Sequence, residues 1–169
     1  GALRGHTAPI NSVRFSHDCA KIVTASADET ARIWDANTGK EIVGLRGHKF
    51  QVNSAEFSAD DRQVVTGGDD KTARLWDANA GKEILVLRGH KFPVGDAEFS
   101  IDGKHVVTAA GPAGDKSGDE TARVWNAVTG QEIISFAGHQ DYLTSAQFSP
   151  DGNRIATTSN DRTARVWDI

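Results

Sequence analysis

The sequence predicts an all-β repeat protein, and three observations carry this prediction. The stretch Asp28–Asp35 recurs three more times along the 169 residues, and every copy reads Asp-x-Thr-Ala-Arg-x-Trp. A Gly-His pair stands ahead of each copy, and successive pairs are separated by 42, 42 and 49 residues. Between these markers apolar and polar residues alternate in short runs, which is the pattern of strands, and no window keeps a helical period.

Each repeat unit contains up to four expected strands. The first follows the Gly-His pair and ends in a Ser-x-Asp turn, which is Asp-Gly in the last two units and suits the positive φ of a tight hairpin. A β-branched second strand follows, as in Ile22–Thr24. The tryptophan motif is the third strand. An Asn-x-Gly turn or a close variant then leads into the fourth, at residues 41–45, 83–87 and 132–136.

A period near 42 residues is typical of propeller blades, each made of four short strands. We therefore expect one array over residues 1–169, with units of roughly 5–46, 47–88, 89–137 and 138–169, and with residues 1–4 as a closing strand. The third unit is longer by seven residues, which fall in the stretch 111–117. Its glycines and proline predict a loop that is more often an idle insertion than a recognition element.

Composition excludes several classes of protein. A net charge of −4 and a pI near 5.8 argue against nucleic-acid binding, which usually needs a basic face. No apolar run reaches the ~18 residues of a membrane-spanning helix, and no apolar stretch at the N-terminus predicts a signal peptide. The single cysteine, Cys19, fits a reducing compartment. We expect a cytoplasmic protein that binds neither nucleic acid nor membranes.

Four residue types recur in phase: the histidine, a hydroxyl on the second strand, the aspartate and the tryptophan. Elimination identifies the hydroxyl, because Thr24 and Ser26 share one face but the positions matching Ser26 in the next two units are Gly68 and Ala110. The resulting sets are His6, Thr24, Asp28 and Trp34; His48, Thr66, Asp70 and Trp76; His90, Thr108, Asp119 and Trp125; and His139, Thr157, Asp161 and Trp167.

This combination resembles the WD-repeat (WD40) β-propeller family over essentially the whole chain. The Gly-His opening, the Phe-Ser-x-Asp turn, the Asp-x-Thr segment and the closing Trp-Asp all match the family pattern; Trp125-Asn126 is the one departure in the closing pair. The resemblance implies a structural hydrogen-bond chain from tryptophan through hydroxyl and histidine to aspartate. Such a chain would satisfy a buried indole N–H and both nitrogens of a buried imidazole.

Asp, His and a Thr hydroxyl are also the parts of a nucleophile triad. A catalytic set of residues occurs once, in one cleft. This set occurs in every unit, together with a tryptophan that is expected to pack in the core. No Gly-x-Ser-x-Gly elbow accompanies it, and no His, Cys or carboxylate cluster has metal-ligand spacing. The sequence therefore predicts no catalytic residue, no metal and no cofactor, with hydrolysis by one set as a remote alternative.

Four units pose a problem of ring closure, because the chain carries only three complete fourth strands. Gly1–Arg4 matches the end of a fourth strand and is expected to supply the missing one. We predict four antiparallel blades forming half of an eight-bladed ring, closed as a C2 homodimer in which each N-terminus completes the other chain's last blade. A closed four-bladed monomer and a fragment of a longer array, natural or engineered, are the alternatives.

Function is expected on one face of the ring, where the loop after each Gly-His pair meets the turn before each Asp-x-Thr. We call this the loop face. The first hypothesis is a non-catalytic scaffold that binds a protein or peptide there. The alternative is a purely structural or engineered fragment that self-assembles and has no partner of its own. The candidate partner-binding residues are Phe50, Phe92, Tyr142, Lys49, Lys91, Asp69 and Asn160.

Overall fold

The computed structural model describes residues 1–111 and 119–169, in which every regular element is a β-strand. Blade 1 contains β1 (Ile10–Phe15), β2 (Lys21–Ser26), β3 (Thr30–Asp35) and β4 (Glu41–Arg46). Blade 2 contains β5 (Val52–Phe57), β6 (Gln63–Gly68), β7 (Thr72–Asp77) and β8 (Glu83–Arg88). Blade 3 contains β9 (Val94–Phe99), β10 (His105–Ala110), β11 (Thr121–Asn126) and β12 (Glu132–Ala137). Blade 4 contains β13 (Leu143–Phe148), β14 (Arg154–Ser159) and β15 (Ala164–Asp168).

Each blade is an antiparallel meander in which neighbouring strands in the sequence pair in the sheet. The strand positions predicted from the repeat are confirmed, with β4, β8 and β12 each extending one residue further than expected. The hairpin between the first two strands contains a residue with positive φ at the same place in every blade. Glycine fills this place in blades 3 and 4, whereas blades 1 and 2 use Cys19 and Asp61, with φ of 59° and 58°.

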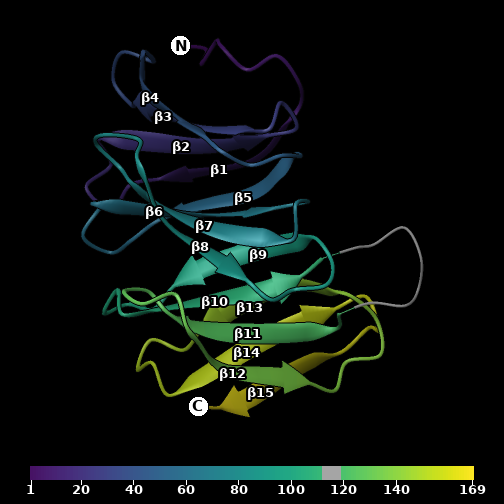
Figure 1. Ribbon diagram of the computed structural model, residues 1–169. Coiled ribbons are helices and arrows are strands. Elements are labelled where there is room, and N and C mark those ends of the chain that lie inside the picture. The colour runs from purple at the N-terminus through teal and green to yellow at the C-terminus, as the bar shows by residue number, and fades with distance from the viewer. Residues whose placement is uncertain (112–118) are drawn as a thin grey trace.

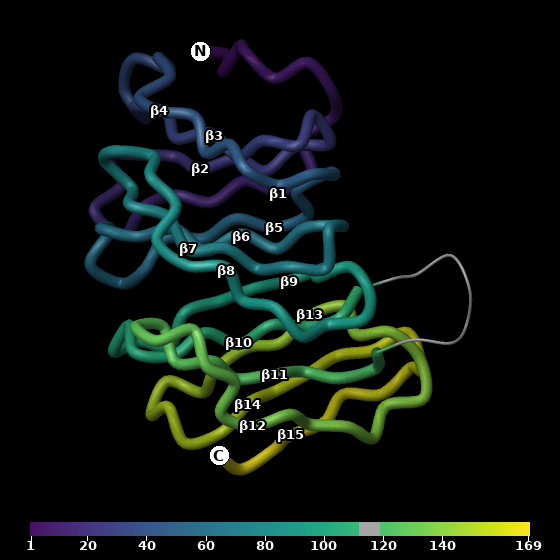
Figure 2. The backbone as a smooth tube through the Cα atoms, in the orientation of Figure 1, coloured from purple at the N-terminus to yellow at the C-terminus, as the bar shows by residue number. Residues whose placement is uncertain are grey.

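The blades follow one another along the molecule, and the two ends of the chain lie at opposite ends of the array (Figure 1). The backbone trace runs from the N-terminal blade at the top to the C-terminal blade at the bottom (Figure 2). The first strands β1, β5, β9 and β13 contact one another in that order. Blades 1 and 4 lie at opposite ends of the array, and no comparable contact joins them among the described residues, so the structure does not contain a four-bladed ring closed within one chain.

The core lies between successive blades. At each junction the apolar face of one blade, built from its second, third and fourth strands, meets the first strand and the tryptophan of the next. Between blades 1 and 2, for example, Ile33 and Leu45 pack against Phe57 and Trp76, and all four are buried. The same packing recurs at the other two junctions, which shows that one interface type holds the array together.

The two ends of the array expose the faces that are buried at these junctions. The outer face of blade 1 carries the exposed residues Ile10, Val13 and Phe15. The outer face of blade 4 includes the exposed Val166. Gly1–Arg4 has no strand partner in the described residues. Leu3 instead lies beside the turn between β3 and β4, with its Cδ2 3.6 Å from where a side chain at Gly39 would begin.

Candidate functional site

The four predicted sets of polar residues each form one connected chain of hydrogen bonds. In blade 1, Trp34 Nε1 donates to Thr24 Oγ1 at 2.8 Å, Thr24 Oγ1 lies 2.8 Å from His6 Nε2, and His6 Nδ1 lies 2.8 Å from Asp28 Oδ2. The corresponding distances in blades 2, 3 and 4 fall between 2.7 and 2.9 Å. One tautomer satisfies every group: the histidine donates from Nδ1 to the carboxylate and accepts the threonine proton at Nε2.

Backbone and side-chain donors keep the aspartate of each set ionised. Burial raises the pKa of Asp28, but hydrogen bonds from the Thr30 hydroxyl, the Thr7 backbone N–H and His6 outweigh it and hold this pKa well below its usual range. The Asp70 and Asp119 carboxyls show the same balance. Each carboxylate therefore ties the loop after the Gly-His pair to the turn that opens the third strand.

This geometry does not offer a nucleophile to a substrate. The hydroxyl-bearing residues Thr24, Thr66, Thr108 and Thr157 are at most 1% exposed. Each threonine oxygen already accepts from an indole and faces an imidazole, so an approaching carbonyl would find no open side. The same arrangement is repeated in all four blades.

In blades 1, 2 and 3 an arginine between the aspartate and the tryptophan of the set links it to the fourth strand. Arg32 Nη1 donates to Glu41 Oε2 at 2.7 Å, and the equivalent pairs are Arg74 with Glu83 at 2.5 Å and Arg123 with Glu132 at 2.8 Å. Arg165 in blade 4 makes no ion pair with the residues that the structure describes. Its guanidinium instead stands over the Trp167 ring, 5.9 Å from the ring centroid. These arginines are constant in the repeated motif but are not among the site residues predicted from the sequence.

The structure brings several of the predicted loop-face residues together in two shallow hollows. Asp69 lines both of them. The first, of about 350 Å³, also has Tyr142 in its wall, and the second, of about 230 Å³, is lined by Lys49 and Phe50. The Asp69 carboxylate accepts hydrogen bonds of 2.8 Å from Gln51 and Asn53, two neighbours in the first hollow.

The remaining loop-face residues are spread around these hollows. Phe50 is 59% exposed, whereas Phe92 is only half-buried and has the ammonium of Lys71 5.7 Å from its ring centroid. Lys91 is exposed and borders a separate hollow of about 250 Å³ near His139. Asn160 is exposed and donates to Asp141 at 2.9 Å. The predicted insertion falls almost entirely outside the described residues, since only Gly111 of the stretch 111–117 is among them.

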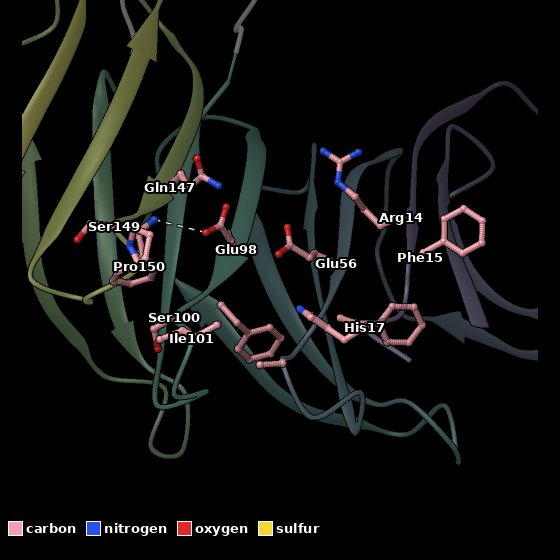
Figure 3. Close-up of a pocket in the computed structure, with 14 residues that line it drawn as sticks. Arg14, Phe15, His17, Glu56, Glu98, Ser100, Ile101, Gln147, Ser149 and Pro150 are labelled. Atoms are coloured by element: carbon pink, nitrogen blue, oxygen red, sulfur yellow. Dashed lines mark hydrogen bonds between the residues drawn. The ribbon is translucent and has the colours of Figure 1, made fainter. Parts of the chain in front are cut away.

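A larger hollow lies among the first strands of the blades and the hairpin turns that follow those strands. It has a volume of about 480 Å³, and Glu56 and Glu98 point into the same space, with Arg14 beyond Glu56 and Gln147 beside Glu98 (Figure 3). These four residues stand at the same position of β5, β9, β1 and β13. In the sequence each of them is a polar residue of a strand in which polar and apolar residues alternate. That pattern predicts ordinary solvent-facing side chains.

Burial in this hollow and the nearby negative charges raise the pKa of both glutamate carboxyls. Burial and the nearby Asp96 carboxylate raise the pKa of Glu56 to about 7. Burial and the neighbouring Glu56 raise the pKa of Glu98 to about 8, although its carboxylate accepts a 3.4 Å hydrogen bond from the Phe148 backbone N–H. Arg14 faces the pair but donates to its neighbour's backbone, the Val13 carbonyl oxygen, so neither glutamate has an ion-pair partner among the described residues.

Among residues 1–111 and 119–169, no group of three or more His, Cys, Asp or Glu side chains could hold a metal ion. None of those residues forms a helix of the length and hydropathy needed to cross a membrane.

Comparison with known proteins gives a consistent picture. A family model described as "WD domain, G-beta repeat" matches residues 1–35, 39–77, 81–126 and 130–168. Pre-mRNA-processing factor 17 of Saccharomyces cerevisiae is 42% identical over 38 residues, which is 22% of this chain and 8% of that protein. Mitochondrial division protein 1 of Mycosarcoma maydis is 45% identical over 40 residues, 24% of this chain and 5% of that protein. The chain thus spans under a tenth of the length of either relative.

Among solved structures, the chain is similar to the computationally designed Ika4 protein. The two share 32% sequence identity and superpose with a TM-score of 0.84, and the match covers 99% of this chain and 96% of the designed one. The designed protein therefore has almost the same extent as this array.

Proposed function

Because the chain belongs to the WD-repeat family, we propose that it is a non-catalytic scaffold that binds a protein or peptide through its loop face. The four hydrogen-bond chains act as structural ties within the blades, which leaves the exposed loops for recognition. The observation that carries the proposal is the pair of hollows that meet at Asp69, with Phe50 exposed at the rim of one and Tyr142 in the wall of the other. Aromatic side chains are enriched at protein-binding surfaces, whose rims are polar.

Pull-down with the wild-type chain and a Phe50→Ala/Tyr142→Ala double variant tests this. We expect partners captured by the wild type to be lost from the variant, because large aromatic anchors supply much of the energy of such interfaces. Val128→Ala is the matched control, since Val128 is 78% exposed and lies in the turn before β12, away from both hollows. An unchanged set of partners with an intact fold contradicts the proposal.

A second candidate is self-assembly, in which two copies form one eight-bladed ring with C2 symmetry. Its support is the match between the two open faces of the array. Phe15 on blade 1 is 62% exposed and Val166 on blade 4 is 66% exposed, while their counterparts at the internal junctions are buried. In this assembly blade 4 of one copy packs on blade 1 of the other, and Gly1–Arg4 runs beside β15.

Light scattering measures this directly, because the chain has a mass of 18.1 kDa. We expect about twice that mass at micromolar concentration, falling to the mass of one chain in a Val166→Asp variant that puts a charge into the apolar contact. A wild-type chain that stays single at these concentrations removes the second candidate and leaves the loop-face proposal standing.

A further inference from the structure

The hollow beside Phe50 on the loop face of blade 2 contains more cations than carboxylates. Its volume is about 230 Å³, and its charged lining residues are Lys49, Lys71, Arg74, Arg88, Asp69 and Asp70. The chain as a whole carries a net charge of −4, so the charge balance of this hollow is opposite to that of the whole molecule. The hollow lies inside the array, because blade 2 has a neighbouring blade on each side.

One of the four cations is already held by carboxylates of its own blade. Arg74 pairs with Asp70 at 3.1 Å and with Glu83 at 2.5 Å, and its side chain is buried. The other three cations are exposed and make no ion pair within the part of the chain that the structure describes; they are Lys49, Lys71 and Arg88. Their charges are therefore available to a ligand.

Blade 3 contains the corresponding hollow without this excess of cations. That hollow is the one of about 250 Å³ near His139. Glu120 takes the place of Lys71 there, and Ala137 takes the place of Arg88. The hollow itself thus recurs from blade to blade, whereas its basic character comes from residues that vary between the blades.

Aromatic rings lie beside the exposed cations. Phe50 lines the hollow and is 59% exposed. The ammonium of Lys71 lies 5.7 Å from the ring centroid of Phe92 on the neighbouring blade, a contact that favours this position of the charge. A segment that enters the hollow meets an apolar ring and positive charge side by side.

We propose that the partner of the loop face presents an acidic segment to this hollow, with an aspartate or glutamate carboxylate near Lys71 and Arg88 and an apolar neighbour on Phe50. Ammonium and guanidinium groups form strong, charge-assisted hydrogen bonds with carboxylates. A carboxylate suits the hollow better than a phosphate dianion, because Asp69 and Asp70 line it as well. This chemistry depends on the loop-face binding proposed above and specifies the class of partner.

Two peptides with the same fluorescent label test the proposal. One has two glutamates on each side of a phenylalanine, and the other has glutamines in their place. Fluorescence anisotropy should show saturable binding of the acidic peptide, about tenfold tighter than that of the glutamine peptide at about 50 mM salt. The difference should shrink as the salt concentration rises, because salt screens exposed charges.

The double variant Lys71→Glu/Arg88→Ala gives blade 2 the residues of blade 3, and it should bind the two peptides equally. Lys40→Glu/Arg62→Ala is the matched control, because it makes the same charge change at exposed positions in the β3–β4 and β5–β6 turns, at the other ends of the strands.

The reverse change, Glu120→Lys/Ala137→Arg, gives blade 3 the residues of blade 2. It should add a second site for the acidic peptide, which a loss of folding cannot do. The stoichiometry of binding measures this gain and keeps the proposal testable if the blade 2 variant does not fold.

Equal affinity of the wild-type chain for the two peptides, or an unchanged preference in the Lys71→Glu/Arg88→Ala variant, overturns the proposal. A phosphoserine peptide that binds more tightly than the glutamate peptide also overturns it, since the hollow would then select phosphate.

The pull-down separates this inference from the function on which it depends. Partners that are lost from the Phe50→Ala/Tyr142→Ala variant but kept by the Lys71→Glu/Arg88→Ala variant would overturn the acidic chemistry alone. Partners that are kept by both variants would overturn the loop-face function itself.

Discussion

Phe15 and Phe57 occupy the same place in blades 1 and 2, yet Phe15 is 62% exposed and Phe57 is 1% exposed. Both end the first strand of their blade; Phe57 faces blade 1, whereas Phe15 lies on the open face of blade 1. The residue type is the same, so the difference comes entirely from whether a neighbouring blade is present. This makes the two phenylalanines a matched pair for measuring what the junction contributes.

Substituting each by alanine should lower the stability of the chain to very different extents. Phe57→Ala removes a ring from a packed junction and is expected to lower the free energy of unfolding by about 3 kcal/mol. Phe15→Ala should change it by no more than about 0.5 kcal/mol in dilute solution, because the ring contacts mostly water there. Urea unfolding at nanomolar concentration gives both values, and equal losses in the two variants would falsify the assignment of Phe15 to an open face.

The hydrogen-bond chains predict a penalty for removing one hydroxyl. Thr66→Val keeps the shape of the side chain but leaves Trp76 Nε1 without its acceptor and His48 Nε2 without its partner. We expect the free energy of unfolding to fall by about 1–3 kcal/mol, the penalty for buried polar groups left unsatisfied. Thr7→Val on the exposed loop is the control for the chemical change. A loss in Thr66→Val no larger than in the control would argue against a structural role for the chain.

The raised pKa values of Glu56 and Glu98 predict that stability falls as the pH rises from weakly acidic to weakly alkaline values. A carboxyl whose pKa is higher in the folded state than in the unfolded state binds more protons when folded, so stability decreases as the pH rises. The window runs from the ordinary value near 4.5 up to about 8, the pKa of Glu98. Glu98→Gln should therefore raise the melting temperature at pH 8 and change it little at pH 5.

Glu29→Gln, an exposed change of the same kind in a turn, serves as the control for this pH dependence. Calorimetry at the two pH values is the measurement. If both variants showed the same shift at pH 8, the effect would belong to the overall charge of the chain and not to the hollow between β5 and β9.

The turn after β1 contains a residue whose backbone conformation is poorly suited to a side chain. Cys19 has a φ of 59°, and glycine occupies its position in blades 3 and 4. Cys19→Gly should stabilise the protein by up to ~1 kcal/mol, since glycine adopts a positive φ without steric strain. Thermal unfolding of this variant beside Gly103→Ala, which makes the reverse change at the matching turn, checks the sign; destabilisation by both would contradict the argument.

Much of the fold could be predicted from the sequence because the repeat supplies its own comparison. Four copies in phase showed which positions are constant, and elimination at the second strand was enough to identify Thr24 and its three counterparts. The strand bounds could be predicted from the turns, because Asp-Gly and Asn-x-Gly mark where the chain reverses between strands.

The hollow around Glu56 and Glu98 could not be predicted in the same way. Alternation places both glutamates on the polar side of their strands, and that side is usually open to water. Here the first strands of neighbouring blades converge, so the two polar rows face each other across a confined space. Only the angle between blades determines this, and the pattern within one blade does not contain it.

The pattern of residue types also cannot predict which apolar faces are covered by a neighbouring blade. Val166 resembles Ile33 and Leu75 in the sequence, but its neighbours are absent from the described array. The same holds for Arg165. Its motif matches the other three, but it makes no ion pair with the described residues, and the motif alone does not predict this difference.

The first two junctions between blades share a polar contact, whereas Gly95 stands at the matching position of the third. Asn11 Nδ2 donates to the Val52 carbonyl oxygen at 2.8 Å, and Asn53 Nδ2 donates to the Val94 carbonyl oxygen at 3.0 Å. The apolar packing, by contrast, recurs at all three junctions, so a unit inserted between two others would meet a compatible apolar face on each side.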